Sequence, residues 1–334
     1  MNAIANEQKN SASSVINSVA YRHGKVLQQV TIEDISEVLK EPGTFVWLGL
    51  LQPDDTYMRQ IQEEFSLHDL AIEDALAAHQ RPKIEQYGES LFIVVKTAQL
   101  VNDVIEYGET HLFVGKNFLV TVRHGASSSY AQVRKHAEEC PALLEKGPGY
   151  ALYVVLDMVV DNYLTILHQY TEQFQQIESR MFKSEFDHSA VQEVYRLRRE
   201  LLSLRNAAVP MTDICNQLIQ HHESLIPKSL RAYLRDVQDH AHQVITTTDD
   251  MREMLANAMH VNLALVSVHQ NEVVQRLAGW GAILAIPTVI FSLYGMNFKD
   301  MPELNDTWGY PVTLGVTIVG CVALYLKLKK SGWL

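Results

Sequence analysis

Residues 277–334 contain two uncharged runs, LAGWGAILAIPTVIFSLY at 277–294 and YPVTLGVTIVGCVALYL at 310–326. At a rise of about 1.5 Å per residue, each run can cross about 30 Å of hydrocarbon as a helix. No amphipathic pattern interrupts either run, whereas a helix buried in a soluble protein normally keeps a polar face. We therefore predict two transmembrane helices, with two buried helices of a soluble protein as the alternative.

Charges beside the two runs predict the orientation of the chain. In the connecting loop, residues 295–309, Lys299 is outnumbered by Asp300, Glu303 and Asp306. Basic residues flank the opposite ends of the runs: Arg276, Lys327, Lys329 and Lys330. The positive-inside rule then predicts a multi-pass protein of the cell (inner) membrane with both termini, including the basic tail 327–334, in the cytoplasm.

The chain as a whole is acidic. Its 334 residues include 39 Asp and Glu against 28 Lys and Arg, a net charge of -11. This charge argues against a nucleic-acid partner and suits a protein that attracts cations, although solubility alone also accounts for it. Cys140, Cys215 and Cys321 are too widely spaced for a disulfide framework or a zinc motif. The polar tail 1–17 lacks the apolar core of a signal peptide, so membrane insertion is expected to depend on the C-terminal runs.

Residues 18–147 are predicted to form a cytoplasmic α/β domain. Apolar and β-branched runs predict strands, and charged amphipathic stretches predict helices. The strands are expected at 44–50, 91–100 and 110–122, the last with a turn at 115–117, and the helices at 31–40, 55–65 and 68–78. No glycine-rich phosphate loop or nucleophile elbow is present, so neither an enzyme nor a small-molecule substrate other than a metal cation is predicted.

Residues 148–276 are predicted to form a helical stalk, because apolar side chains recur at alternating steps of three and four. Pro210 and Pro227 are predicted to interrupt its helices. From Ser229 no proline or glycine occurs until Gly279, so a helix from about Ser229 to Tyr294 would be about 100 Å long. Such a helix suits a stalk in which copies of the chain pack around an axis.

One stripe of the first transmembrane run is small or hydroxylated. With its cytoplasmic extension, the stripe comprises Asn271, Val274, Leu277, Gly281, Ala285, Thr288 and Ser292, and it continues to Gly295. Close helix packing would explain small residues alone, but the succession of side-chain oxygens favours a polar, uncharged pore. Pro287 removes a backbone donor and frees the carbonyl of Ile283, a defect that a water-lined cavity tolerates.

Motifs at the end of this run resemble the CorA magnesium and cobalt transporters. The segment YGMNF at 294–298 is followed by MPEL at 301–304 and WGYP at 308–311, and the resemblance extends to EDALAAHQRPKIE at 73–85 and YLRDVQDH at 233–240. It implies a funnel-shaped homopentamer in membrane lipid, with a cytoplasmic α/β domain, a long-helix stalk, and 277–294 lining the pore. It also implies influx of hydrated Mg²⁺, with Co²⁺ and possible Ni²⁺, driven by the membrane potential and gated by intracellular Mg²⁺.

The resemblance assigns the selectivity filter to Gly295, Met296 and Asn297. Mg²⁺ holds its waters tightly, so uncharged oxygens that accept hydrogen bonds from those waters could select the ion without dehydrating it. An ordinary helix C-terminus, where glycine and asparagine relieve backbone strain, is the alternative. Glu303 in the outer loop could concentrate cations at the mouth, or be simply solvated.

Gating is also implied by the resemblance. Leu277 and Val274 would form apolar rings that close the pore by dewetting, with simple helix packing as the alternative. Intracellular Mg²⁺ would bind acidic residues at subunit boundaries: Glu73, Asp74, Asp157 and Asp236. A solvated carboxylate on a helix face is the alternative for each of them. His260 stands where an aspartate is expected, which suggests a weaker Mg²⁺ sensor or one biased towards a transition metal, or else a residue without a metal role.

Two other functions fit the sequence. A zinc transporter of the same superfamily would share the architecture, but it commonly carries valine in place of Met296. A membrane-anchored scaffold that does not transport would need no Thr288, Ser292 and Asn297 on one face. We therefore favour magnesium transport.

Overall fold

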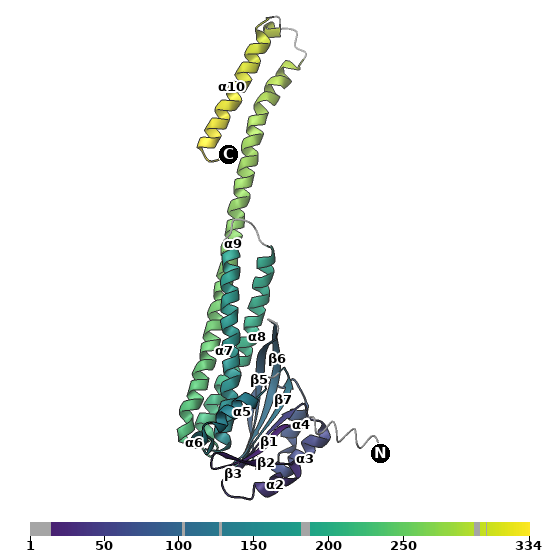
Figure 1. The fold of residues 1–334 in the computed structure, drawn as a ribbon. Coiled ribbons are helices and arrows are strands. Elements are labelled where there is room, and N and C mark those ends of the chain that lie inside the picture. The colour runs from purple at the N-terminus through teal and green to yellow at the C-terminus, as the bar shows by residue number, and fades with distance from the viewer. Residues whose placement is uncertain (1–14, 102–103, 127–128, 182–187, 297–300, 305) are drawn as a thin grey trace. The chain divides into compact units, whose positions relative to one another are not determined.

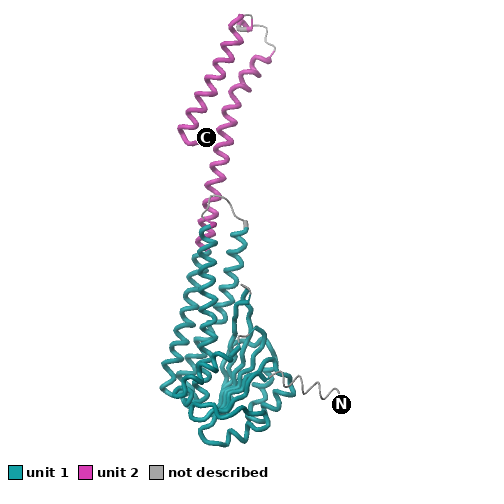
Figure 2. Tube along the Cα trace, viewed as in Figure 1, with its two compact units in different colours: residues 1–179, 189–255 teal, residues 180–188, 256–334 magenta. Residues whose placement is uncertain are grey.

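The computed structural model describes residues 15–101, 104–126, 129–181, 188–296, 301–304 and 306–334 (Figure 1). The chain divides into two compact units (Figure 2). Unit 1 comprises residues 1–179 and 189–255, and unit 2 comprises residues 180–188 and 256–334. Helix α9 (Arg231–Tyr294) contributes residues to both.

Unit 1 is built on a seven-stranded sheet with strand order β2-β1-β3-β7-β6-β5-β4. Its strands are β1 (Val15–Arg22), β2 (Lys25–Gln29), β3 (Thr44–Leu51), β4 (Lys83–Tyr87), β5 (Ser90–Val101), β6 (Val104–Val114) and β7 (Phe118–Gly125). The pair β3 and β7 is parallel, and the other five pairs are antiparallel. The strands predicted at 44–50, 91–100 and 110–122 are confirmed, and residues 115–117 connect β6 to β7.

Strands β1, β2 and β4 were not predicted. Strand β2 (KVLQQ) is exposed at every position, and β4 (KIEQY) has no fully buried position. Both are edge strands of the sheet, so neither carries the alternating apolar residues that identify a half-buried strand.

Helices α3 (Asp55–Phe65) and α4 (Asp69–Leu76) cover one face of the sheet (Figure 1). Their buried side chains form one core cluster with β3, β6 and β7. Asp54 caps α3 by accepting a hydrogen bond from the Tyr57 amide at 2.7 Å, and Ser66 ends it in the left-handed conformation. The helices predicted at 55–65 and 68–78 are confirmed, whereas the region 31–40 contains only a 3-10 turn (Ile32–Asp34) and the short α2 (Ile35–Val38).

Helices α5 (Ala131–Glu138), α6 (Pro141–Leu144) and α7 (Pro148–Met181) follow the last strand, and α5 and α7 contact the sheet. From α5, the buried guanidinium of Arg134 lies 4.4 Å from the centre of the Trp47 ring and donates to the Trp47 carbonyl at 3.0 Å. From α7, the buried Tyr163 hydroxyl donates to the Lys96 carbonyl. These contacts fix both helices to β3 and β5.

In unit 1, α7 lies beside α8 (His188–His221) and the first part of α9 (Figure 1). The predicted break at Pro210 is wrong, because α8 continues through it. A proline inside a helix leaves the carbonyl four residues earlier without its usual donor. Here that carbonyl belongs to Asn206, which is exposed and open to water. The predicted interruption at Pro227 is confirmed, since Pro227 caps a 3-10 turn (Lys228–Leu230) that precedes α9.

Unit 2 contains the last part of α9, a 3-10 turn (Pro302–Leu304) and α10 (Gly309–Lys330). By length and composition, α7, α9 and α10 are each apolar enough to cross a membrane. Helix α7 differs from the other two, because 61% of its most apolar segment is buried inside the protein, compared with 11% for α9 and 6% for α10. The predicted fold class, an α/β domain followed by a long helix and a C-terminal apolar helix, is confirmed.

A histidine cluster ties α4 to the sheet. The Nε2 atom of His124 on β7 lies 2.9 Å from the Ala75 carbonyl of α4, and its ring centre is 5.0 Å from that of His111. Glu109 accepts a hydrogen bond from the His79 amide at 2.7 Å and lies 3.3 Å from Nε2 of His111. Burial, followed by the nearby charge of His111, lowers the pKa of His124.

We predict that this cluster makes unfolding pH-dependent. Because the folded protein favours neutral His124, its contribution to stability is complete above the unfolded-state pKa of about 6.5 and is lost as pH falls through the lower folded-state pKa. Thermal unfolding of the full chain in detergent, followed between pH 7.5 and 5.5, should show a falling midpoint. His124→Gln should flatten this slope, whereas His136→Gln, at an exposed position, should leave it unchanged. An unaltered slope in His124→Gln would contradict the assignment.

Candidate ion pathway and metal site

Helix α9 presents its small and hydroxylated stripe away from α10. All seven predicted pore residues are exposed in the single chain: Asn271, Val274, Leu277, Gly281, Ala285, Thr288 and Ser292. Leu277 is 72% exposed. The Thr288 hydroxyl donates to the Leu284 carbonyl at 2.8 Å, so its proton is used within the helix and its oxygen lone pairs remain available as acceptors.

Helix α10 covers the opposite face of α9. The Trp280 and Tyr325 rings lie 6.3 Å apart, and Ile283 is only 8% exposed. A β-carbon placed on Gly320 of α10 would lie 3.8 Å from Ile286, at ordinary contact distance. Contact with α10 therefore leaves the stripe exposed, together with apolar side chains such as Leu284 and Val289.

The consequence predicted for Pro287 needs correction. The Ile283 carbonyl, which Pro287 leaves without a helical donor, lies on the side of α10 and not on the stripe. It accepts a hydrogen bond from the Cys321 thiol of α10, with Sγ at 3.7 Å. Helix packing, rather than a water-lined cavity, satisfies this backbone group.

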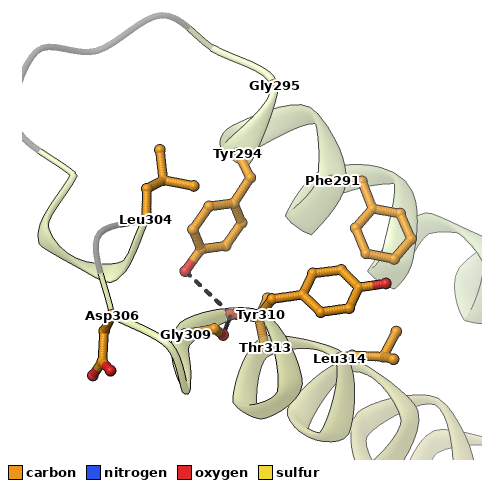
Figure 3. Close-up of a pocket in the computed structure, with 9 residues that line it drawn as sticks. All are labelled: Phe291, Tyr294, Gly295, Leu304, Asp306, Gly309, Tyr310, Thr313 and Leu314. Atoms are coloured by element: carbon orange, nitrogen blue, oxygen red, sulfur yellow. Dashed lines mark hydrogen bonds between the residues drawn. The ribbon is translucent and has the colours of Figure 1, made fainter.

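The outer end of α9 is fastened to the start of α10 (Figure 3). The Tyr294 ring extends towards Thr313, whose hydroxyl lies 3.5 Å from the Tyr294 hydroxyl and also donates to the Gly309 carbonyl at 2.9 Å. A cavity of about 380 Å³ lies beside this contact and is lined by Phe291, Tyr294, Gly295, Leu304, Asp306, Gly309, Tyr310, Thr313 and Leu314. The contact holds the residue immediately before the GMN motif.

The predicted filter begins at this end. Gly295 and Met296 are exposed, and Gly295 does not have a positive φ, so a left-handed helix cap does not account for this glycine. Asn297 lies outside the described residues. Glu303 falls in the 3-10 turn Pro302–Leu304.

Unit 1 brings together a second group of potential ligands. One oxygen each from Asp157 on α7 and Asp236 on α9, with one ring nitrogen of His240 on α9, lie within 4.8 Å of one another. It is the sole group of three such side chains found among the described residues. Two carboxylates and an imidazole at this spacing can bind a divalent cation, and the imidazole suits cobalt or zinc better than magnesium.

The surroundings of this group favour a positive ion. Burial, followed by the charge of Asp161, raises the pKa of Asp157, so ionising this carboxyl group costs more free energy than it would in water. The Tyr153 hydroxyl donates to Asp157 at 3.3 Å. The buried Nδ1 atom of His240 has no hydrogen-bond partner among the described residues. A bound cation would compensate the carboxylates and could use an imidazole nitrogen.

His240 was not predicted as a ligand, although a signal was present. It follows Asp236 by four residues, a spacing that places both on one face of a helix. The proximity of Asp157 could not be predicted from spacing, because it depends on the packing of α7 against α9.

The other predicted ligands lie elsewhere. Glu73 and Asp74 are on α4, on the opposite side of the sheet from α7 and α9 (Figure 1). Glu73 is exposed, and Asp74 pairs with Lys83 at 2.6 Å. His260 is exposed on α9 and is outside the three-residue group. One copy of the chain therefore does not gather all four predicted carboxylates.

Comparisons with known proteins agree on one family. The family model described as CorA-like Mg²⁺ transporter protein matches residues 42–330. The cobalt/magnesium transport protein CorA of Thermotoga maritima is 30% identical over 307 residues, which cover 90% of this chain and 87% of that protein.

Solved structures share the fold. The complete structure of the CorA magnesium transporter from Methanocaldococcus jannaschii matches with a TM-score of 0.77 and 18% identity, covering 96% of this chain and 99% of that one. The cytoplasmic domain of ZntB from Vibrio parahaemolyticus matches with a TM-score of 0.58 and 12% identity, covering 75% of this chain and 97% of that one. At these identities the likeness concerns the fold alone.

We predict that Asp157 and Asp236 are required for metal-induced stabilisation. A ligand that binds the folded protein raises its unfolding temperature, so Co²⁺ and Mg²⁺ should stabilise the wild type. Asp157→Asn and Asp236→Asn should each weaken this effect, and in the wild type it should decline as pH falls towards the raised pKa of Asp157. Asp239→Asn is the matched control, with the same charge change at an exposed position of α9. Full stabilisation in both ligand variants would rule out the site.

The Cys321 contact predicts an order of stability. Cys321→Ala removes the donor to the Ile283 carbonyl and should destabilise unit 2 by about 0.5–1 kcal/mol, the usual range for such bonds between membrane helices. Cys321→Ser keeps a donor and should remain close to the wild type. Thermal unfolding in detergent would test this, with Val322→Ala as an exposed control on α10. Equal stability of the Ala and Ser variants would contradict the role of the thiol.

Proposed function

Because the chain belongs to the CorA-like Mg²⁺ transporter family of divalent metal transporters, which are membrane proteins and not enzymes, we propose that it mediates influx of hydrated Mg²⁺ through a pore lined by α9. The membrane potential drives the ion without ATP. The observation that carries this proposal is the stripe from Asn271 to Ser292, which is exposed on the face of α9 that α10 leaves uncovered.

The pore requires several copies of α9. The exposed hydroxyls of Thr288 and Ser292 are more favourable against water than against lipid, so the stripe belongs at a water-filled axis. We propose a homopentamer in the cell (inner) membrane with both termini in the cytoplasm. The number of copies rests on the family resemblance.

The filter would consist of Gly295, Met296 and Asn297. A ring of Asn297 carboxamides and Gly295 carbonyls accepts hydrogen bonds from the waters of Mg²⁺, which avoids the large cost of dehydrating this ion. The ring is uncharged, so it holds the ion loosely enough to release it. Glu303 would raise the cation concentration at the outer mouth.

Gating would combine two sites on α9. Val274 and Leu277 close the pore as apolar rings when intracellular metal is bound. The metal occupies the group formed by Asp157, Asp236 and His240, with Glu73 and Asp74 supplied across a subunit boundary. Support for this arrangement comes from α4 and α7 lying on opposite sides of the sheet, so that one chain alone does not unite the two sets (Figure 1). Loss of the metal leaves like charges unneutralised and favours the open state.

Transition metals are further candidate ions. The relative from Thermotoga maritima is named for cobalt as well as magnesium, and His240 adds an imidazole to the regulatory group. We therefore include Co²⁺ among the transported ions, with Ni²⁺ as a further candidate. Zn²⁺ transport is the alternative, favoured by the same imidazole, and His260 would add to such a bias.

Ion flux into proteoliposomes tests the proposal. With dye inside and an inside-negative potential, wild type should conduct Mg²⁺, and Asn297→Ala should reduce the flux by about tenfold, equivalent to about 1.4 kcal/mol. Asn206→Ala, an exposed carboxamide on α8, is the control. Zn²⁺ flux without Mg²⁺ flux would favour the zinc transporter, and no flux of any ion from well-inserted protein would favour the scaffold.

If Leu277 forms the gate, changing it should let ions leak through the closed pore. At high internal Mg²⁺ the pore is closed, so Leu277→Gly should raise residual flux, because its smaller and more easily wetted ring no longer excludes water. Leu326→Gly, at an exposed position on α10, should not raise it. Unchanged closed-state flux in Leu277→Gly would remove this residue from the gate.

A further inference from the structure

The segment after α10 folds back as a defined turn. The amides of Gly332 and Trp333 donate to the carbonyls of Lys329 and Leu328 at 3.2 and 3.0 Å. Gly332 has a φ of 74°, the left-handed conformation that glycine adopts without strain. These two bonds and this φ together form a Schellman motif, which turns Trp333 and Leu334 back alongside α10.

Leu334 then packs against α9 at Gly279. A β-carbon on Gly279 would lie 3.3 Å from both Cγ and Cδ2 of Leu334 and 3.7 Å from Leu328. The missing side chain of Gly279 therefore provides the space that Leu334 uses. We call this contact, made by Gly332, Trp333 and Leu334 on Gly279, the clasp.

The clasp acts on the helical turn that carries the proposed gate. Gly279 follows Leu277 by two residues, about 200° around an α-helix, so the two residues face in nearly opposite directions. Leu277 is 72% exposed, whereas Gly279 meets Leu334 and Leu328. Trp280, in the same turn, faces Tyr325, and the Lys329 ammonium lies 5.8 Å from the centre of that Tyr325 ring. Contacts from α10 and the clasp thus fix the rotation of this turn about its axis.

We propose that the clasp positions Leu277 in the closed pore, and that opening requires Leu334 to leave or shift on Gly279. The proposal rests on the proposed transport function and adds Gly279, Gly332 and Leu334 as positioning residues. They touch no ion. They act by determining which side of α9 faces the pore axis.

Size changes at the contact test the proposal. Gly279→Val would displace Leu334 by overpacking, and Leu334→Ala would remove its side chain. Each should therefore weaken the closed-state contact and raise flux at high internal Mg²⁺ by about tenfold. Flux at low internal Mg²⁺ should stay within about twofold of wild type, since the open state does not use the contact. The double variant Gly279→Val/Leu334→Ala restores the total volume and should return the leak towards wild type, as should the conservative Leu334→Met.

The controls separate positioning from folding. Gly315→Val adds the same side chain to α10, where a β-carbon would meet nothing within 4 Å, and it should leave both fluxes unchanged. A clasp needed only for folding or assembly would lower both fluxes together and reduce the yield of oligomer. That result, or additive effects in the double variant, would overturn the proposal.

Cross-linking tests the contact without relying on transport. In the variant Gly279→Cys/Leu334→Cys, oxidation should form a disulfide, and Mg²⁺ should accelerate it by favouring the closed state. The oxidised protein should remain closed at low internal Mg²⁺ and recover with reductant. Failure to cross-link, a cross-linking rate that does not depend on Mg²⁺, or full flux through cross-linked protein would overturn the clasp. Absence of flux from wild type would instead count against the proposed function.

Discussion

The packing of α10 on one face of α9 determines what the other face can do. Hydrocarbon offers no hydrogen bonds, so each polar group within the membrane needs a partner from protein or from water. Helix α10 meets this need on its own side, where the Cys321 thiol reaches the Ile283 carbonyl. It leaves Thr288 and Ser292 exposed on the opposite side. These exposed hydroxyls find hydrogen-bond partners only when water or further copies of the chain lie against this second face.

The transmembrane run 277–294, which carries most of the uncharged stripe, contains no carboxylate. A fixed negative charge in the membrane would be costly and would bind a divalent ion too strongly for rapid release. Tight, selective binding suits a sensor instead. We propose Asp157, Asp236 and His240 as that kind of site in unit 1, where burial raises the pKa of Asp157. In the proposed mechanism, conduction and sensing would therefore use different oxygen chemistry because they require opposite affinities.

Much of this organisation could be predicted from the sequence, because strong apolar patterns identified α3, β3, β5 and the two C-terminal helices. Strands β2 and β4 were not predicted because they lie at the edges of the sheet and carry no alternating apolar pattern. The break predicted at Pro210 was wrong because the carbonyl that Pro210 leaves without a donor belongs to an exposed residue, Asn206, where water can replace the missing bond. The metal group could be predicted only in part, since Asp157 and His240 meet through packing between helices. Likewise, no local rule connects Cys321 to Ile283, or Leu334 to Gly279.

Three features of the proposed mechanism lie on the single helix α9. It bears two candidate ligands, Asp236 and His240, the proposed gate at Leu277, and the proposed clasp site at Gly279. Between Arg231 and Ala278 it contains no proline or glycine, the residues that most often kink a helix. In the proposed mechanism, a change at Asp236 would act on Leu277 along this helix. The first glycine of α9 occurs where Leu334 contacts the helix, so the residue with the lowest helix propensity in this segment is the one that this contact supports. In this proposal, Leu277, two residues before Gly279, is held in the closed position while Leu334 contacts Gly279 and is released when that contact is lost.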